Sequence, residues 1–224
     1  MVKKLKGTIE KIIEESEDVK SFWIKLEEDF AFTPGQFVIV SLPDLEKKGA
    51  FSIGSSPTEH KNKILITVKK VGLLTGKLHE AKLGDIINII GPLGDFTFKE
   101  QNNDLVLIAG GCGIVPFRSI IHYVLDKKLK NKVVLLYSAR TEKDIIYRYE
   151  WEKLKNKNIK IVITLTRQQW EGRTGRIDKQ LIEDSARNLK NPEFFVCGPQ
   201  QLVEEISEKI KQAGYNRIRI DKWR

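Results

Sequence analysis

The fold of this chain is indicated most clearly by one stretch, LVLIAGGCGIVP at positions 105–116. Its apolar run Leu105–Ala109 is typical of a strand that is buried on both faces of a parallel sheet. The glycines that follow allow a tight turn and a close approach of the backbone to a ligand. Pro116 suits the first turn of a helix, whose N-terminus offers free N–H groups and a positive dipole end to phosphate. This order of strand, glycine turn and helix favours a dinucleotide-binding loop over a glycine turn without a ligand.

Strands and helices keep alternating after this stretch, which predicts a parallel α/β sheet. The expected helices are Val115–Asp126, Asp144–Leu154, Asp178–Asn188 and Gln200–Ala213, and the expected strands are Val133–Tyr137, Ile159–Leu165, Glu193–Cys197 and Arg217–Ile220. Ligands of such sheets bind at the carboxyl ends of the strands. We therefore expect the chemistry at Gly110–Gly113, Tyr137–Arg140, Leu165–Arg167 and Cys197–Pro199.

The part before this stretch has a different pattern, with short β-rich runs separated by turns that contain Gly, Pro, Asn or Asp. This pattern predicts a small antiparallel barrel or sandwich with one short helix from Thr75 to about Ala81. The expected strands are Leu5–Ile13, Val19–Leu26, Phe37–Ser41, Lys63–Val68 and Ile86–Ile90.

The charge divides the chain at the same place. The 224 residues carry a formal net charge of +9. Residues 1–100 contain 15 lysines, no arginine and 15 acidic residues, whereas residues 101–224 contain the other 24 basic residues against 15 acidic ones. This shift predicts two domains with different ligands, at residues 1–99 and 100–224.

Several function classes are excluded by composition. Cys112 and Cys197 are too few for a disulfide framework, a four-cysteine zinc site or an iron–sulfur cluster, and they favour a cytoplasmic location. No apolar run approaches the roughly 18 residues of a membrane span, and the N-terminus does not resemble a signal peptide. His60, His79 and His122 are scattered without ligand spacing, so we interpret them as non-catalytic. The basic charge also fits a nucleic-acid-binding protein, but no motif of that class is present.

Four segments are candidate site elements, and each has a plainer alternative. Ser138 and Arg140 follow a strand where an acidic residue commonly reads the ribose of NAD, which leaves room for a 2′-phosphate; the alternative is a solvated arginine. Cys197 fits a catalytic cleft or a buried structural cysteine. Phe51–Pro57 suits stacking on a planar ring or an ordinary strand and turn, and Gly72–Thr75 suits a phosphate cradle or an ordinary helix cap.

Together these segments resemble the ferredoxin–NADP reductase-like family of flavoenzymes, in order and spacing over nearly the whole chain. PGQF at 34–37, FSIGSSP at 51–57, GLLT at 72–75 and GPLGDF at 91–96 are similar to its motifs P-G-Q-[FY], R-x-Y-S, G-x-x-[ST] and G-P-x-G-x-F. GGCGIVP at 110–116, SAR at 138–140 with Asp144, CGP at 197–199 and IRIDKW at 218–223 are similar to its nicotinamide and C-terminal motifs. Each motif is weak alone, but eight in the right order form a strong signal.

The resemblance implies a flavin-binding antiparallel β-barrel followed by a Rossmann-like α/β domain, with FAD, or FMN in its place, as cofactor and NAD(P)H as co-substrate. It implies that Phe51 stacks on the flavin and that the catalytic residues are Ser52, Cys197, Asp221 and Trp223. The residues implied for the flavin are Phe51, Ser52, Ile53, Val68, Lys69, Gly72, Leu73, Leu74 and Thr75, and those for the dinucleotide are Gly110, Gly111, Cys112, Gly113, Ile114, Pro116, Ser138, Ala139, Arg140, Arg167, Cys197, Gly198 and Pro199.

Three positions depart from the family pattern. Gly49 stands where the family has the arginine of R-x-Y-S, Phe51 replaces its tyrosine, and Asp221 replaces its terminal glutamate. A lysine cannot make the bidentate contact of an arginine, so Lys47, Lys48, Lys69 or Lys70 would supply charge to a flavin phosphate without that geometry.

We therefore predict a reductase that transfers hydride from NAD(P)H to flavin and passes the electrons on. The expected acceptor is an electron-carrier protein, such as ferredoxin, flavodoxin or a redox subunit, or a small molecule, because no iron–sulfur cluster is expected within the chain. Acidic carriers suit the basic second half. The alternative is a non-catalytic subunit that binds flavin or nucleotide in a larger complex.

Overall fold

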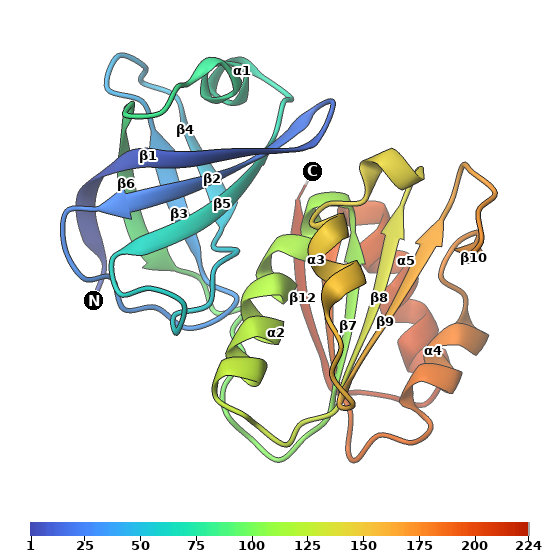
Figure 1. Cartoon of the computed structure of the whole chain (residues 1–224). Helices are drawn as coiled ribbons and strands as arrows, with labels where there is room; N and C mark the ends of the chain where they lie inside the picture. Colours follow the sequence, from blue (N-terminus) through green and yellow to red (C-terminus); the bar gives the residue numbers. More distant parts are fainter. Residues whose placement is uncertain (224) are drawn as a thin grey trace. The chain divides into compact units, whose positions relative to one another are not determined.

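The computed structural model describes residues 1–223 and divides into two compact units (Figure 1). Unit 1 comprises Met1–Lys99 together with Val115–Lys128. Unit 2 comprises Glu100–Ile114 and the chain from Leu129 onward. The helix that follows the glycine loop therefore groups with the N-terminal half of the chain. No helix within residues 1–223 is long and apolar enough to cross a membrane.

Unit 1 contains a six-stranded antiparallel sheet in the order β4-β3-β6-β1-β2-β5. The sheet curls, because the edge strand β4 leads into an Ile53–Ile66 bridge with the opposite edge strand β5. Alternate apolar side chains from these strands fill the interior, as the two-residue period of a strand requires. The strands are β1 Lys3–Ser16, β2 Val19–Leu26, β3 Phe37–Ser41, β4 Lys48–Ser52, β5 Lys63–Lys69 and β6 Ile86–Leu93.

Two helices complete unit 1, α1 at Leu73–Glu80 and α2 at Val115–Asp126. Helix α2 is buried along its first turns, and aromatic contacts attach it to the segment after β6. The ring of Phe117 lies 6.1 Å from that of Phe96, and the ring of Tyr123 lies 6.3 Å from that of Phe98. These contacts explain why α2 belongs to unit 1.

Unit 2 is built on a six-stranded parallel sheet in the order β10-β9-β8-β7-β11-β12. The chain runs outward from β7 through β8 and β9 to β10 and then returns to the other side of β7. The carboxyl ends of the neighbours β7 and β11 therefore form the topological switch point, where ligands of such sheets bind. The strands are β7 Leu105–Gly110, β8 Val133–Ala139, β9 Ile159–Leu165, β10 Arg173–Thr174, β11 Glu193–Pro199 and β12 Ile218–Trp223.

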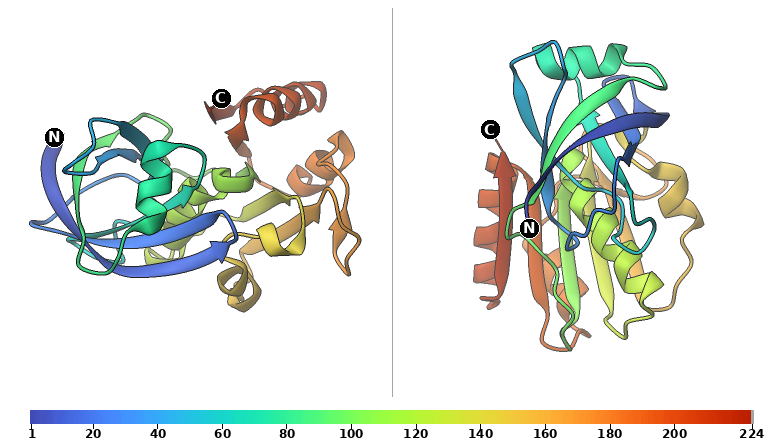
Figure 2. Two further views of the ribbon diagram at one scale, coloured as in Figure 1. Left: turned by 90° about the horizontal axis from the view of Figure 1, so that it is seen from above. Right: turned by 90° about the vertical axis from the view of Figure 1, so that its left-hand side faces the viewer.

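The helices of unit 2 lie on both faces of this sheet (Figure 2). Helices α4, Lys179–Ala186, and α5, Gln200–Gln212, bury their apolar sides on one face against alternate residues of β7, β8 and β11. The short helix α3, Arg148–Lys153, lies on the opposite side. Two 3₁₀ turns, η1 at Gly111–Ile114 and η2 at Glu142–Asp144, follow β7 and β8.

The predicted fold class is confirmed, an antiparallel barrel-like sheet followed by a parallel α/β sheet, and some element bounds differ. The helix expected at Asp144–Leu154 is shorter, because Asp144 accepts hydrogen bonds from Thr141 and closes η2 instead. Helix α3 begins only after Tyr147, which has a left-handed φ of 60°. Strand β12 extends to Trp223 rather than ending at Ile220, and the strands β4 and β10 were not expected.

Candidate active site

The glycine loop after β7 packs tightly against β11. A Cβ on Gly113 would lie 2.0 Å from the carbonyl oxygen of Cys197, so only glycine fits there. A Cβ on Gly111 would meet no atom within 4 Å, and its φ of +53° suits glycine. The backbone at Gly111 is therefore accessible to a ligand, whereas the backbone at Gly113 is packed against Cys197. This geometry lets the backbone of the loop lie close to a dinucleotide diphosphate.

Three of the expected catalytic residues lie together on the neighbouring strands β11 and β12. Cys197 pairs with Asp221 in the strand register, and Pro199 pairs with Trp223. The Cys197 thiol is fully buried and donates to Asp221 Oδ2 over 3.8 Å. Burial raises the pKa of this thiol well above its ordinary value, and the Asp221 charge raises it further. The sulfur therefore keeps its proton at neutral pH.

Two arginines lie side by side at the ends of β8 and β9. The Arg167 N–H donates to the Arg140 carbonyl over 2.9 Å, and the Thr166 N–H donates to the Ala139 carbonyl over 3.0 Å. Both arginine side chains are exposed, and neither has an ion-pair partner among residues 1–223. The two strand ends thus present two cations to solvent. The nearby Asp144 carboxylate is occupied by Thr141.

The expected flavin motif lies at the end of β4. The Phe51 ring leans over Gly49, where a Cβ would lie 2.9 Å from the ring and 2.9 Å from Leu74. Phe51 and Leu74 therefore lie near each other around Gly49. The glycine that replaces the family arginine is the residue that leaves space for this ring.

Helix α1 begins at an open turn. Thr75 Oγ1 accepts hydrogen bonds from the N–H groups of Val71 and Gly72, both at 2.9 Å, and donates to the Gly72 carbonyl. A Cβ on Gly72 would meet nothing within 4 Å. The first N–H groups of a helix have no acceptor within it, so this turn fits a phosphate group. Lys69 beside it is paired with Asp18 at 3.0 Å.

Two residues implied for the flavin have side chains that pack in the core. Ile53 and Val68 are fully buried in the barrel. The Ile53 N–H donates to Gln36, and His79 Nε2 lies 2.9 Å from the Val68 carbonyl. Only main-chain atoms of Ile53 and Val68 remain for a cofactor. His79, expected to be non-catalytic, has a structural contact here.

Comparisons with known proteins agree with this geometry. Residues 6–98 match the oxidoreductase FAD-binding domain, and residues 107–208 match the oxidoreductase NAD-binding domain. The chain is 34% identical over 199 residues to the sulfhydrogenase 1 subunit gamma of Pyrococcus furiosus, which covers 85% of this chain and 67% of that protein. The chain belongs to the ferredoxin–NADP reductase-like family. It is an NAD(P)H-dependent flavoprotein reductase, as the sequence predicted.

Two further members of this family extend the comparison. The glycine betaine monooxygenase reductase subunit of Pseudomonas aeruginosa is 31% identical over 226 residues, with 93% of this chain and 61% of that protein covered. The structure of a ferredoxin NADP⁺ reductase from Neisseria gonorrhoeae, with bound FAD and NADP, superimposes with a TM-score of 0.83 at 20% identity, over 99% of this chain and 98% of that one. The chain thus spans about two thirds of the length of the two curated relatives.

Sequence reasoning missed one group of residues in this reductase, a polar cluster formed by the turn Gly54–Glu59 and helix α2. Its members from α2 include Arg118 and Ser119, which are buried within the otherwise apolar run Val115–Ile121. A charged residue in such a run is costly unless it is paired. That interruption is the signal in the sequence that would have marked the cluster.

Proposed function

We propose that unit 1 of this reductase holds FAD at β4 and α1, that unit 2 holds NADPH at β7, β8 and β11, and that electrons leave for a carrier protein or a redox subunit. The observation that carries the proposal is the meeting of the glycine loop with the Cys197–Asp221 pair at the switch point. The domain boundary that we predicted between residues 99 and 100 belongs to this proposal.

In unit 1, the roles that we propose follow from where the residues lie and from which of their groups are available to a ligand. Phe51 at the end of β4 offers an apolar ring for stacking, and Ser52 beside it offers a hydroxyl that has no hydrogen-bond partner among residues 1–223. The backbone of Gly72–Thr75 holds phosphate oxygens, while the Thr75 hydroxyl keeps the turn in shape. A flavin bound there would supply a hydride acceptor and a donor of single electrons.

In unit 2, the residues have two proposed roles. They orient the dinucleotide, and they keep a thiolate charge away from it. The backbone of Gly110–Ile114 binds the diphosphate, and Gly113 lets this loop lie against Cys197. Because Cys197 stays protonated, no thiolate repels an anionic dinucleotide at this strand end. Asp221 accepts a hydrogen bond from the Cys197 thiol and fixes the direction of that thiol. Trp223, 38% exposed on β12 and paired in register with Pro199, offers an aromatic ring for closing the flavin site.

The arginine pair supports NADPH over NADH. Arg140 stands where a carboxylate commonly accepts hydrogen bonds from the ribose hydroxyls of NAD, and Arg167 lies beside it. Their guanidinium groups have no carboxylate partner within residues 1–223, so they are available for a 2′-phosphate.

The partner and the location are also proposals. One relative is named as a sulfhydrogenase subunit and another as a monooxygenase reductase subunit. Such names favour a neighbouring redox protein as the acceptor of electrons from this chain. The absence of an iron–sulfur cluster and a cytoplasmic location remain predictions from the cysteine count.

The nucleotide preference is tested with purified protein loaded with FAD and with ferricyanide as the electron acceptor. We expect a lower KM for NADPH than for NADH in the unchanged protein. Arg140→Ala should raise the KM for NADPH about 10-fold, since a charged hydrogen bond contributes about 1.5 kcal/mol, and should leave the KM for NADH unchanged. Arg187→Ala, in the exposed pair with Asp184, is the matched control. Equal effects of Arg140→Ala on both nucleotides would contradict NADPH selection.

A further inference from the structure

The turn Gly54–Glu59, which contains the end of the flavin motif, is fixed on one side by strand β5. The Gly54 N–H donates to the Leu65 carbonyl over 2.7 Å, and the Leu65 N–H donates to Ser55 Oγ over 3.1 Å. Ser55 and Ser56 are fully buried. Gly54 lies two residues after Ser52, the last residue of β4, so a shift of the turn would move the end of this strand.

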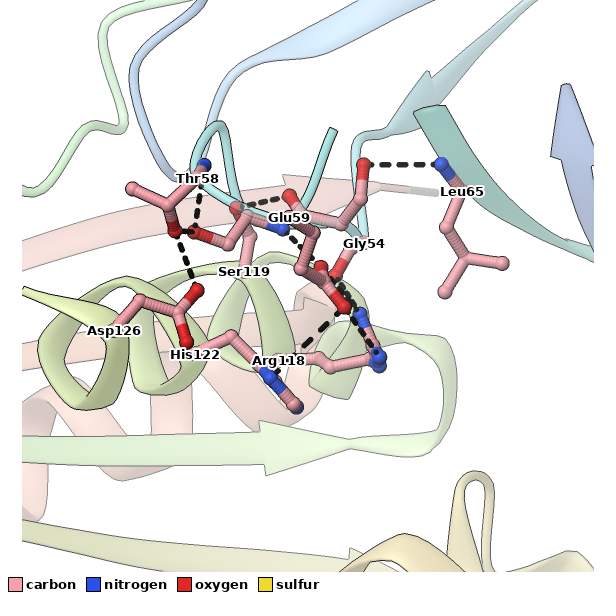
Figure 3. Close-up of polar contacts among 10 residues, drawn as sticks. Gly54, Thr58, Glu59, Leu65, Arg118, Ser119, His122 and Asp126 are labelled. Atoms are coloured by element: carbon pink, nitrogen blue, oxygen red, sulfur yellow. Dashed lines mark hydrogen bonds and ion pairs between the residues drawn. The ribbon is translucent and has the colours of Figure 1, made fainter. Parts of the chain in front are cut away.

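Helix α2 holds the other side of the same turn (Figure 3). Arg118 Nη1 donates to the Gly54 carbonyl over 2.9 Å, and the guanidinium forms two bonds to the Glu59 carboxylate, both at 3.1 Å. Ser119 Oγ donates to the Ser55 carbonyl over 2.6 Å. One helical face thus reaches two main-chain carbonyls of the turn.

Two further residues on the same face of α2, nearer the C-terminal end of the helix, also belong to the cluster. His122 Nδ1 lies 4.0 Å from Glu59 Oε1, and Asp126 Oδ2 accepts from the Thr58 hydroxyl over 2.5 Å (Figure 3). Residues 118, 122 and 126 are spaced by four, which places them on one side of a helix. The turn is therefore held along more than two turns of α2.

The central ion pair is too buried to be a solvated surface contact. The Arg118 side chain is 7% exposed and the Glu59 side chain 18% exposed. The Arg118 guanidinium carbon also lies 5.9 Å from the Trp23 ring centre. An exposed ion pair contributes little, whereas removal of one partner of a buried pair leaves an uncompensated charge. The pair therefore restricts α2 and the turn to one relative position.

Arg118 is also close in sequence to the glycine loop. Arg118 lies two residues after Pro116, the last residue of the dinucleotide-binding motif. The helix that completes this motif is thus bonded directly to the turn that ends the flavin motif.

We propose that Arg118, with Glu59 and Ser119, is a positioning residue for hydride transfer. It fixes the main chain beside Ser52 relative to the first turn of α2, and it touches neither cofactor nor substrate. The proposal rests on the proposed function, since it requires a flavin that NADPH reduces.

The test is anaerobic reduction of the FAD-loaded chain by saturating NADPH, with the rate expressed per bound flavin. Arg118→Lys keeps the charge but loses the bidentate geometry. We expect its limiting rate of flavin reduction to fall about 100-fold, because a misplacement of reacting groups by about 1 Å can slow a reaction by this factor. Its flavin content and its dissociation constant for NADP⁺ should stay within about twofold of those of the unchanged chain. Arg187→Lys, in the exposed pair with Asp184, should change none of these quantities.

Ser119→Ala is the second variant, because it removes one hydrogen bond and no charge. We expect its limiting rate to fall by a smaller factor, again with unchanged flavin content and NADP⁺ affinity. An unchanged limiting rate in Arg118→Lys would overturn the proposal. If both variants lose flavin content or NADP⁺ affinity while the limiting rate per bound flavin stays unchanged, the cluster has a purely structural role, and this result would also overturn the proposal. If NADPH does not reduce the unchanged chain, the proposed function fails instead.

Discussion

The turn Gly54–Glu59 and the loop Gly110–Ile114 both follow a strand end, but they are held in place by different means. Side chains hold the turn, since Arg118 and Ser119 bond to its main chain. The loop is held by close contact between its main chain and that of β11, since a Cβ on Gly113 would collide with the Cys197 carbonyl oxygen. The position of the turn can therefore be changed in small steps by substitution, whereas the loop accepts no side chain at its tightest point.

The largest expected effect follows from adding a methyl group to the loop. Gly113→Ala would place a Cβ 2.0 Å from the Cys197 carbonyl oxygen, so the loop or β11 must move. We expect the free energy of unfolding to fall by about 3 kcal/mol, the upper part of the range for overpacking, and NADPH binding to be lost. Chemical denaturation and a nucleotide titration measure the two effects.

Gly111→Ala is the matched control for that change. Its Cβ meets no atom, and only the left-handed φ costs about 1 kcal/mol. Equal destabilisation by the two substitutions would show that strain in the backbone, and not contact with β11, limits the loop.

A smaller loss is expected from the buried pair that holds the turn. Glu59→Gln keeps the shape of the side chain but leaves the Arg118 charge without its partner. We expect a loss of about 2 kcal/mol in unfolding free energy, the range of hydrogen bonds to charged groups. Asp184→Asn, in an exposed pair, should cost no more than about 0.5 kcal/mol. Similar losses at the two sites would contradict the distinction between a buried and a solvated pair.

The smallest effect concerns the pH dependence of stability at the strand beside the loop. Burial and Asp221 raise the pKa of the Cys197 thiol in the folded state. The folded chain therefore keeps a proton that the unfolded chain loses above about pH 8.5. The resulting stability is complete below that pH and is lost as the pH rises toward the folded-state pKa.

We expect this contribution to fall by about 1 kcal/mol between about pH 8.5 and about pH 9.5. The measurement is the difference in unfolding free energy between the unchanged chain and Cys197→Ala, which removes contributions from other titrating groups. If the two chains lose stability in parallel over this range, the folded state does not raise the pKa of the Cys197 thiol, contrary to the structure.

Local patterns predicted much of the secondary structure from the sequence. The bounds expected for the strands Val19–Leu26, Phe37–Ser41 and Ile159–Leu165 and for the helix Val115–Asp126 agree with the structure. Each has a clear apolar period or run, bounded by turn residues. Strand β4 was missed because Lys48, Gly49 and Ala50 favour strands weakly. Its pairing with β3 is a tertiary effect.

The motifs predicted the candidate site residues at strand ends and at the start of α1, but they did not predict the polar cluster that holds the turn Gly54–Glu59. The Cys197–Asp221 neighbourhood follows from two motifs on parallel strands. Grouping of α2 with the barrel does not follow from any local pattern, because Glu59 and Arg118 are 59 positions apart. The burial of Ile53 and Val68 was missed for a related reason, since a motif marks a backbone position and not the direction of each side chain.

The most direct test of the central claim is anaerobic stopped-flow mixing of the FAD-loaded chain with NADPH and with NADH near neutral pH. The account predicts that both nucleotides bleach the absorbance band of oxidised flavin, and that NADPH does so at the lower concentration. A flavin band that persists with both nucleotides would contradict the assignment of this chain as an NAD(P)H-dependent flavoprotein reductase.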